Sequence, residues 1–334
     1  MSQHIGDLKN LETLDFYTES IDRFKKLFRV EPMMYIHDLH PDYLSTKYAK
    51  SSGKYTIGVQ HHHAHIASCM GEHGLDEKVI GVSFDGVGLG TDHNIWGGEF
   101  LVADYAGFER YTHFEYVPQP GGDLATENPW RMALSYLYKY FENGFENLDL
   151  PFLRSIDREN RELVIQSIDK NINTPLTSSA GRLFDAVSAL LGLCIKSTFH
   201  AEAPMRLEAI IKPGIQDTYP FRVDKTISFG EMLNEMVKDI FNNKPSWYIS
   251  TKFHNTLISV IFAVASDIKK ASGINKVVLT GGTFQNRYLL RETENLLAKN
   301  GFEVYAHQDV PSNDGGIALG QLLIGARLQK LGLA

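Results

Sequence analysis

The stretch VIGVSFDGVG (79–88) places an apolar run directly before a carboxylate and two glycines. A short run rich in valine, isoleucine and phenylalanine with glycines beside it is typical of a buried strand. We therefore predict a strand over residues 79–84 that ends at Asp85, whose side chain would reach the carboxyl edge of a sheet. Outward from this strand, the apolar periodicity alternates between strand and helix along the whole chain. This alternation predicts an α/β protein with a mixed or mainly parallel sheet.

The same patterns predict the other elements and a division into two lobes. Further strands are predicted over 34–36, 55–59, 100–103, 276–279 and 304–305. Helices are predicted over 8–29, 43–48, 129–141, 158–170, 181–191, 251–270 and 316–329, with another beginning at the histidines near residue 61 and another after residue 282. A loop rich in proline and glycine at 117–123 suggests the boundary between lobes. We expect a first α/β lobe over 1–117, closed by the C-terminal helix at 316–332, and a second over 118–315, with the ligand in a cleft between them.

Length and composition exclude several classes of protein. With 334 residues, of which 43% are hydrophobic and 22% charged, the chain is long enough for two lobes and too apolar for a disordered protein. The net charge of -7 argues against a surface dedicated to nucleic acid. Two cysteines, Cys69 and Cys194, cannot build a disulfide framework or a cysteine zinc site, which favours a reducing compartment. The most apolar stretch, 257–265, is too short for a bilayer of roughly 30 Å, so a cytoplasmic protein without a membrane partner is expected.

The run QHHHAH (60–65) is the least ordinary feature of the sequence. It follows a predicted strand and begins a predicted helix, where His61 and His65 are four residues apart. That spacing places both imidazoles on one helix face, as two ligands of one metal ion require. His62 and His65, three residues apart, are the next candidate pair. The alternative is a solvated or capping histidine cluster, but four histidines between apolar neighbours favour metal binding.

Two carboxylates stand where such a site needs further ligands. Asp85 ends the strand described above, and Asp314 lies in SNDGG (312–316), just ahead of the final helix. Either aspartate in isolation is more typical of a turn or a helix N-cap. Considered with the histidine pair, they predict a site with two histidines, a carboxylate and an open position for water.

Three glycine-containing segments are interpreted as strand-to-helix turns that contact a nucleotide or a phosphate. They are DGVG (85–88), SAGR (179–182) and TGGT (280–283). Glycine permits close approach of the backbone, and the N–H groups at a helix start attract anions. Asp185 could accept from ribose hydroxyls and Asn286 could contact a base or ribose, with solvent exposure and helix capping as the alternatives. The glycines assigned to this role are Gly86, Gly88, Gly181, Gly281 and Gly282.

Together these segments resemble the C-terminal, carbamoyl-transferring module of the hydrogenase maturation protein family HypF. The resemblance spans essentially the whole chain in ten ordered segments. They are SQHIGDL (2–8), HDLHPDY (37–43), VQHHHAHIAS (59–68), FDGVGLG (84–90), WGGEF (96–100), PGGDLA (120–125), PWRMA (129–133), SSAGRLFDAVSALLG (178–192), TGGTFQN (280–286) and PSNDGGIALGQ (311–321). Wider relatives are similar to the two-lobed fold of actin, Hsp70 and the sugar kinases, in which ligands bind between the lobes.

The resemblance implies a set of ligands and a reaction. A divalent metal ion, zinc or iron, would be held by His61, His65, Asp85 and Asp314, the first three of which would act in catalysis. An adenine nucleotide (carbamoyl-adenylate, ATP or AMP) would lie against the glycine turns and the polar residues named above. The carbamoyl group of carbamoyl-adenylate would pass to the C-terminal cysteine of a HypE-like partner protein. No general base is identified by the residues, and His62 and His63 are the candidates.

The sequence also departs from the family pattern. This sequence does not contain the acylphosphatase-like, zinc-finger and adenylate-forming regions of full-length members. The strands that usually precede SQHIGDL are also not in this sequence, so the first lobe would lack its initial strands. The resemblance therefore implies a fragment or one half of a split protein, which transfers a carbamoyl-adenylate supplied by a separate domain or chain. Ala201 stands where relatives tend to have glycine, which affects part of the expected nucleotide contact.

Three other functions compete with this interpretation. The first is a transferase that makes threonylcarbamoyladenosine on tRNA, which the HHHAH, WGGE and PWRMA segments and the acidic balance disfavour. The second is a module that binds metal and nucleotide and docks the partner without activity of its own. The third is a hydrolase with two histidines and a carboxylate, which explains the metal ligands and leaves the glycine turns without a role.

Overall fold

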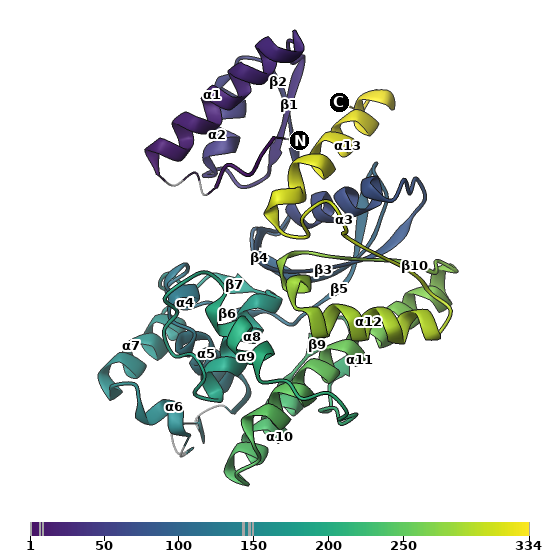
Figure 1. Cartoon of the computed structure of the whole chain (residues 1–334). Coiled ribbons are helices and arrows are strands. Elements are labelled where there is room, and N and C mark those ends of the chain that lie inside the picture. Colours follow the sequence, from purple (N-terminus) through teal and green to yellow (C-terminus); the bar gives the residue numbers. More distant parts are fainter. Residues whose placement is uncertain are drawn as a thin grey trace.

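The computed structural model describes residues 2–333 except 7, 9, 142, 143, 146, 147 and 149. Residue 9 belongs to the first predicted helix, and the other omitted positions belong to the predicted lobes. All of them lie outside the described residues. The chain begins with a small unit made of α1 (Leu11–Phe28), β1 (Met34–Asp38), α2 (Leu44–Ser51) and β2 (Tyr55–Val59). β1 and β2 pair in parallel and form a sheet of their own. Figure 1 shows this unit at one end of the molecule, beside α13 (Ile317–Lys330).

A mixed sheet of seven strands forms the centre of the molecule. Its strand order is β11-β10-β3-β4-β7-β6, and β5 pairs with β4. β3 is parallel to β10 and antiparallel to β4. The strands are β3 (Val79–Leu89), β4 (Ile95–Ala103), β5 (Phe108–His113), β6 (Val117–Pro118), β7 (Leu176–Thr177), β10 (Lys276–Thr280) and β11 (Glu303–Ala306). A short hairpin of β8 (Arg222–Val223) and β9 (Ile227–Ser228) lies apart from this sheet.

Helices cover both faces of the large sheet. α3 (His61–Glu72) contacts β3, β4 and β10 on one face, and α8 (Ala180–Leu190) and α11 (Ser246–Ser272) contact β3 on the other. The remaining helices are α4 (Leu124–Glu127), α5 (Trp130–Phe141), α6 (Pro151–Arg154), α7 (Arg158–Asp169), α9 (Glu202–Ala209), α10 (Gly230–Phe241) and α12 (Arg287–Lys299), with 3-10 turns η2 (Gly282–Gln285) and η3 (Asp314–Gly316). The sequence prediction of an α/β protein with a mixed sheet is confirmed.

Successive side chains of the central strands pack into two separate hydrophobic cores. On β3, Val79 packs into the core beneath α3 and α13, whereas Ile80 and Val82 pack into the core beneath α8 and α11. Successive side chains of a strand point to opposite faces, so a sheet covered on both sides is apolar throughout. α13 contacts α3 and both strands of the N-terminal unit, and Figure 1 shows it between them. The C-terminal helix therefore packs between that unit and α3.

One predicted turn is wrong. Residues 85–88 do not connect a strand to a helix, because β3 continues through them to Leu89 and then pairs with β4 as a hairpin. The register of β3 against β4 shifts between Phe84 and Gly88, so Asp85 lies at an irregularity inside the strand and does not end it. The physical reason is that the chain reverses only further on, where the backbone N–H of Gly90 donates to the carbonyl of Asn94 at 2.8 Å. The other two predicted turns, before α8 and before α12, are confirmed.

The predicted boundary at residue 117 remains a prediction. The large sheet combines strands from both sides of that residue, β3 to β5 before it and β7, β10 and β11 after it. In the part of the chain that the structure describes, no helix has the length and apolarity required to cross a membrane.

Candidate metal and nucleotide site

Helix α3 presents the histidine cluster to the interior. Gln60 begins the helix as its N-cap, and its side-chain oxygen accepts the backbone N–H of His63 at 2.9 Å. The side chains of His61 and His65 are each 1% exposed. Their ring centroids lie 4.9 Å apart because the two residues are one helical turn from each other. The predicted pairing of these two histidines is thus present, and the alternative of a solvated cluster is wrong.

Two carboxylates from distant parts of the chain meet this pair. The Asp85 Oδ2 atom, from β3, lies 2.9 Å from His65 Nε2 and 3.7 Å from His61 Nε2. The Asp314 Oδ1 atom, from η3, lies 3.5 Å and 3.6 Å from the same two nitrogens. One ligand atom of each of the four residues lies within 4.8 Å of all the others. The structure therefore gathers the four residues expected to bind a metal ion.

Three ligand atoms of this group have no hydrogen-bond partner, which fits a site for a cation. His61 Nε2, His65 Nε2 and Asp85 Oδ2 are fully buried, and none of them makes a hydrogen bond of acceptable geometry. Buried polar atoms without partners are rare in folded proteins. Two imidazoles and two carboxylates are a donor set that both zinc and iron accept. The side chain of Asp314 is 70% exposed, so this ligand stands at the outer side of the group.

The histidines and carboxylates of this group shift one another's pKa values. Burial opposes protonation of His61, but the carboxylates of Asp314, Asp38 and Asp85 outweigh it and raise the pKa of this imidazole well above its ordinary value. Burial raises the pKa of Asp85, and the two histidines more than reverse that effect, so its pKa lies well below the ordinary value. The acids are therefore ionised and available as ligands at neutral pH.

Two glycine turns pack against the Asp85–Gly86 stretch of β3. A Cβ atom on Gly181, at the start of α8, would lie 3.0 Å from the Cα of Gly86. A Cβ atom on Gly282 would lie 3.1 Å from Asp85 Oδ1. The Ser179 hydroxyl, which caps α8, donates to the carbonyls of Asp85 and Gly86 at 2.8 and 2.7 Å. The structure thus brings two of the segments that the sequence singled out against Asp85 and Gly86, and an added Cβ atom at Gly181 or Gly282 would make a tight contact there.

The two polar residues expected at a nucleotide already have partners. Asp185 is 2% exposed and accepts from Arg182 Nε at 2.7 Å. Asn286 uses its side-chain oxygen to cap α12 by accepting the N–H of Leu289, and its amide nitrogen donates to His254 Nε2 at 2.9 Å. The capping alternative therefore holds for Asn286, while contact of either residue with a nucleotide stays a prediction.

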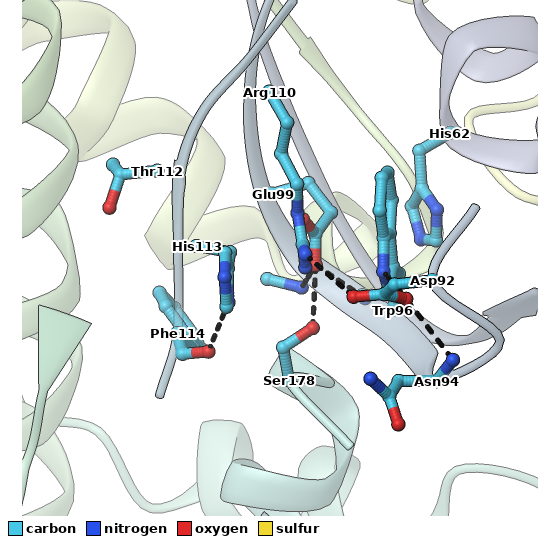
Figure 2. Close-up of polar contacts among 12 residues, drawn as sticks. His62, Asp92, Asn94, Trp96, Glu99, Arg110, Thr112, His113, Phe114 and Ser178 are labelled. Carbon is cyan, nitrogen blue, oxygen red and sulfur yellow. Dashed lines mark hydrogen bonds and ion pairs between the residues drawn. The ribbon is translucent and has the colours of Figure 1, made fainter. Parts of the chain in front are cut away.

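The hairpin of β3 and β4 contains a buried carboxylate that the sequence analysis missed. Glu99 is fully buried and accepts the backbone N–H groups of Gly97 and Gly98 at 3.1 and 3.3 Å. It also accepts from Ser178 Oγ at 2.6 Å and from Arg110 Nε at 2.7 Å (Figure 2). A Cβ atom on Gly97 would lie 2.5 Å from the Asp85 carbonyl, so Glu99 holds the hairpin backbone against the candidate site. The only signal in the sequence was the WGGE segment itself.

The other histidines of α3 have different surroundings. Figure 2 shows His62 and Arg110 on opposite sides of the Trp96 ring, and the Arg110 guanidinium lies 3.7 Å from the ring centroid. Burial lowers the pKa of His62 well below its ordinary value, with His61 adding to the effect, so His62 is neutral. His63 Nε2 lies 2.6 Å from the Asp104 carbonyl. The His63 ring therefore has its partner outside the metal-ligand group. The assignment of His62 or His63 as general base stays a prediction.

Comparisons with known proteins place the whole chain beside one family. Residues 81–321 match the family model "Carbamoyltransferase, Kae1-like Domain, second subdomain", and residues 1–72 match the model "HypF Kae1-like domain". Among curated relatives, carbamoyltransferase HypF of Synechocystis is 37% identical over 97% of this chain, which covers 44% of that protein. A carbamoyltransferase HypF homolog of Cupriavidus necator is 32% identical over 99% of this chain, which covers 86% of it.

Solved structures agree with these matches. A crystal structure of full-length HypF in the phosphate- and nucleotide-bound form has a TM-score of 0.94 and 46% sequence identity, and the match covers 98% of this chain and 52% of that one. The structure of HypF from T. kodakarensis has a TM-score of 0.87 and 32% identity over 99% of this chain and 45% of that one. The chain thus spans about half the length of most relatives it matches. The expected two-lobed family fold is confirmed.

Proposed function

The chain belongs to the HypF family of carbamoyltransferases, and on this premise we propose that it catalyses the carbamoyl transfer step of hydrogenase maturation. In the proposed reaction, carbamoyl-adenylate donates the carbamoyl group to the C-terminal cysteine thiolate of a HypE-like protein. The adenylate is supplied by a separate domain or chain.

The observation that carries the proposal is the group of buried ligand atoms without hydrogen-bond partners. His61, His65, Asp85 and Asp314 would hold one zinc or iron ion, since three of their ligand atoms are buried and have no hydrogen-bond partner. A metal ion bound there would supply Lewis-acid stabilisation of the negative charge that develops on the carbamoyl or phosphate oxygen.

The chain needs no nucleophile of its own for this reaction. The partner's thiolate attacks the carbamoyl carbon, a carbon–sulfur bond forms, and the bond from that carbon to the phosphate oxygen breaks, which releases AMP. The two cysteines of this chain are buried in the folded protein, and burial raises the pKa of both thiols, so neither competes as acceptor. A Cβ atom on Gly86 would meet no atom within 4 Å, so an adenylate phosphate would lie against this backbone beside Asp85.

Transfer of labelled carbamoyl tests the proposal directly. The chain is incubated with a HypE-like partner and carbamoyl-adenylate made with labelled carbamoyl, and the label on the partner's terminal cysteine is measured. We expect transfer by the wild-type chain, and loss of both transfer and about one equivalent of metal in His61→Ala or His65→Ala, because each removes one of few ligands. His73→Ala, outside the ligand group, is the matched control. Partner binding without label on the cysteine would favour the module that only docks, and label on tRNA would favour the competing transferase.

Binding of adenylate is tested separately. Asp185→Asn keeps the size of a side chain that lies one turn into α8, and removes its charge. If this residue accepts from the ribose hydroxyls, calorimetry with AMP will show weaker binding, while the metal content stays that of the wild-type chain. Unchanged AMP affinity would contradict the role of Asp185 and leave the metal site unaffected.

A further inference from the structure

Asp38 is a buried carboxylate that contacts the metal-ligand group from the N-terminal unit. It is the last residue of β1, and its side chain is 6% exposed. Its Oδ2 atom lies 2.8 Å from His61 Nδ1, and its Oδ1 atom accepts the backbone N–H of His40 at 2.8 Å. Each oxygen therefore has its own nitrogen neighbour, and Asp38 is not one of the four candidate ligands.

This contact decides which nitrogen of His61 is free. An ionised carboxylate only accepts hydrogen bonds, so the Nδ1 atom beside it carries the proton. In the neutral ring, the form that binds a metal ion, the lone pair is then on Nε2, which lies 3.7 Å from Asp85 Oδ2 and 3.6 Å from Asp314 Oδ1 and has no hydrogen-bond partner. We propose that Asp38 is a positioning residue that fixes the tautomer and ring orientation of His61 as a metal ligand. The inference rests on the proposed function, because it requires the metal site.

The neighbouring histidine shows the opposite arrangement. His62 Nδ1 lies 3.1 Å from Gln60 Nε2. The Gln60 amide is oriented because its Oε1 atom accepts the backbone N–H of His63. An amide N–H donates, so His62 Nδ1 accepts and the proton of the neutral ring resides on Nε2. His62 is therefore held in the tautomer whose Nε2 cannot bind a cation. The partner of Nδ1, carboxylate or amide, thus distinguishes the two adjacent histidines.

The substitution Asp38→Asn tests the charge and the acceptor at constant shape. Asparagine has one oxygen for two N–H donors, those of His40 and His61, so one donor must face the NH2 group. If the oxygen keeps the backbone bond to His40, the amide N–H donates to His61 Nδ1 and the proton moves to Nε2. Partners of metal-bound histidines typically contribute 10- to 100-fold in affinity, so we expect a loss of zinc affinity of about that size.

The experiment uses the full 334-residue chain. Zinc affinity is measured by competition with a chromophoric chelator, and the cobalt-loaded chain gives a visible absorption spectrum that reports the ligand geometry. Asp42→Asn is the matched control, because Asp42 lies in the same segment and its side chain is 76% exposed beside Lys47. We expect weaker zinc binding and an altered cobalt spectrum in Asp38→Asn only, with the far-UV circular dichroism of the metal-free chain unchanged.

The outcomes separate this inference from the proposed function. A wild-type chain that binds neither zinc nor cobalt would overturn the metal site and the role of Asp38 with it. Wild-type binding together with equal affinity and an identical spectrum in Asp38→Asn would overturn the role of Asp38 alone. Should the variant fold poorly, NMR of the histidine rings in the zinc-loaded wild-type chain decides the question: a proton on His61 Nδ1 supports the proposal, and its absence contradicts it.

Discussion

His254 is a buried imidazole whose surroundings favour the neutral form. It lies inside α11, where its Nδ1 atom is 2.7 Å from the Ser250 carbonyl and its Nε2 atom accepts from the amide of Asn286. Burial lowers the pKa of His254 to about 4, and the Ser250 carbonyl only partly opposes this effect. The Nε2 acceptor role requires a neutral ring, so protonation would break the link between α11 and the N-cap of α12.

A pH dependence of stability follows at this residue. The pKa of His254 is near 6.5 in the unfolded chain and about 4 in the folded chain. As the pH falls, the unfolded state therefore binds the proton first. The stabilisation is therefore complete above pH 6.5 and declines as the pH falls toward 4. Between pH 7 and pH 5 we expect this residue to remove about 2 kcal/mol of the free energy of unfolding.

Denaturant unfolding at the two pH values measures this contribution. The decrease from pH 7 to pH 5 is compared between the wild-type chain and His254→Gln, whose amide oxygen can still accept from Asn286 and does not titrate. We expect the wild-type decrease to exceed that of the variant by about 2 kcal/mol. Equal decreases in the two proteins would show that His254 is not the group responsible.

At the scale of elements, one side chain of α3 makes several of the contacts that hold the segment carrying Asp314. Glu72, at the C-terminal end of α3, accepts three successive backbone N–H groups through Oε1, those of residues 308–310 at 2.9, 2.6 and 3.3 Å. Its Oε2 atom lies 3.1 Å from His307 Nδ1. The segment from β11 to η3 is thereby attached to the same helix that presents His61 and His65.

Removing the charge of Glu72 is expected to loosen this attachment. In Glu72→Gln the amide group replaces one oxygen, so either the backbone contacts or the contact with His307 loses its acceptor. Hydrogen bonds to a charged group typically contribute about 1.5–3 kcal/mol, so the free energy of unfolding should fall by about that amount. Zinc affinity should fall as well, because Asp314 is less precisely placed.

Glu77→Gln is the matched control for this prediction. Glu77 follows α3 in the chain and pairs with Lys276, and its side chain is 50% exposed. A surface ion pair of this kind contributes roughly 0–1 kcal/mol, so little change in stability or zinc affinity is expected. Zinc titration and thermal unfolding of both variants provide the measurement, and equal behaviour of the two would contradict the role given to Glu72.

At the scale of the whole molecule, the candidate site joins segments that are far apart in the sequence. Its ligands come from α3, β3 and η3, and Asp38 adds the N-terminal unit through β1. Figure 1 shows that this unit and the large sheet lie on either side of α13. A cation at the site would bind the folded arrangement more tightly than the unfolded chain, because no short stretch of chain contains all four ligands.

Zinc is therefore expected to stabilise the whole chain. A ligand that binds only the folded state adds about 2.7 kcal/mol when its concentration is 100 times its dissociation constant. The melting temperature of the wild-type chain should rise with added zinc and fall with a chelator. His61→Ala should show neither change, and a wild-type melting temperature that is independent of zinc would contradict the metal site.

The local features of the protein could be predicted from its amino-acid sequence. The strand and helix positions followed from apolar periodicity, because each element must turn one face or both toward a core. The spacing of His61 and His65 predicted their proximity, since the pitch of a helix is set by its backbone and not by the rest of the molecule. The motif resemblance then predicted Asp85 and Asp314 as further ligands, which the structure brings to the pair.

Features that depend on contacts between distant parts of the chain could be read only from the folded molecule. The course of β3 through residues 85–88 depends on pairing with β4, which glycine-rich sequence alone does not reveal. The partners of Asp38, Glu72 and Glu99 are backbone and side-chain groups brought together by packing, and an isolated acidic residue in the sequence carries no sign of them. Hydrogen bonds of buried carboxylates are set by three-dimensional proximity, whereas periodicity and spacing report only on neighbours along one element.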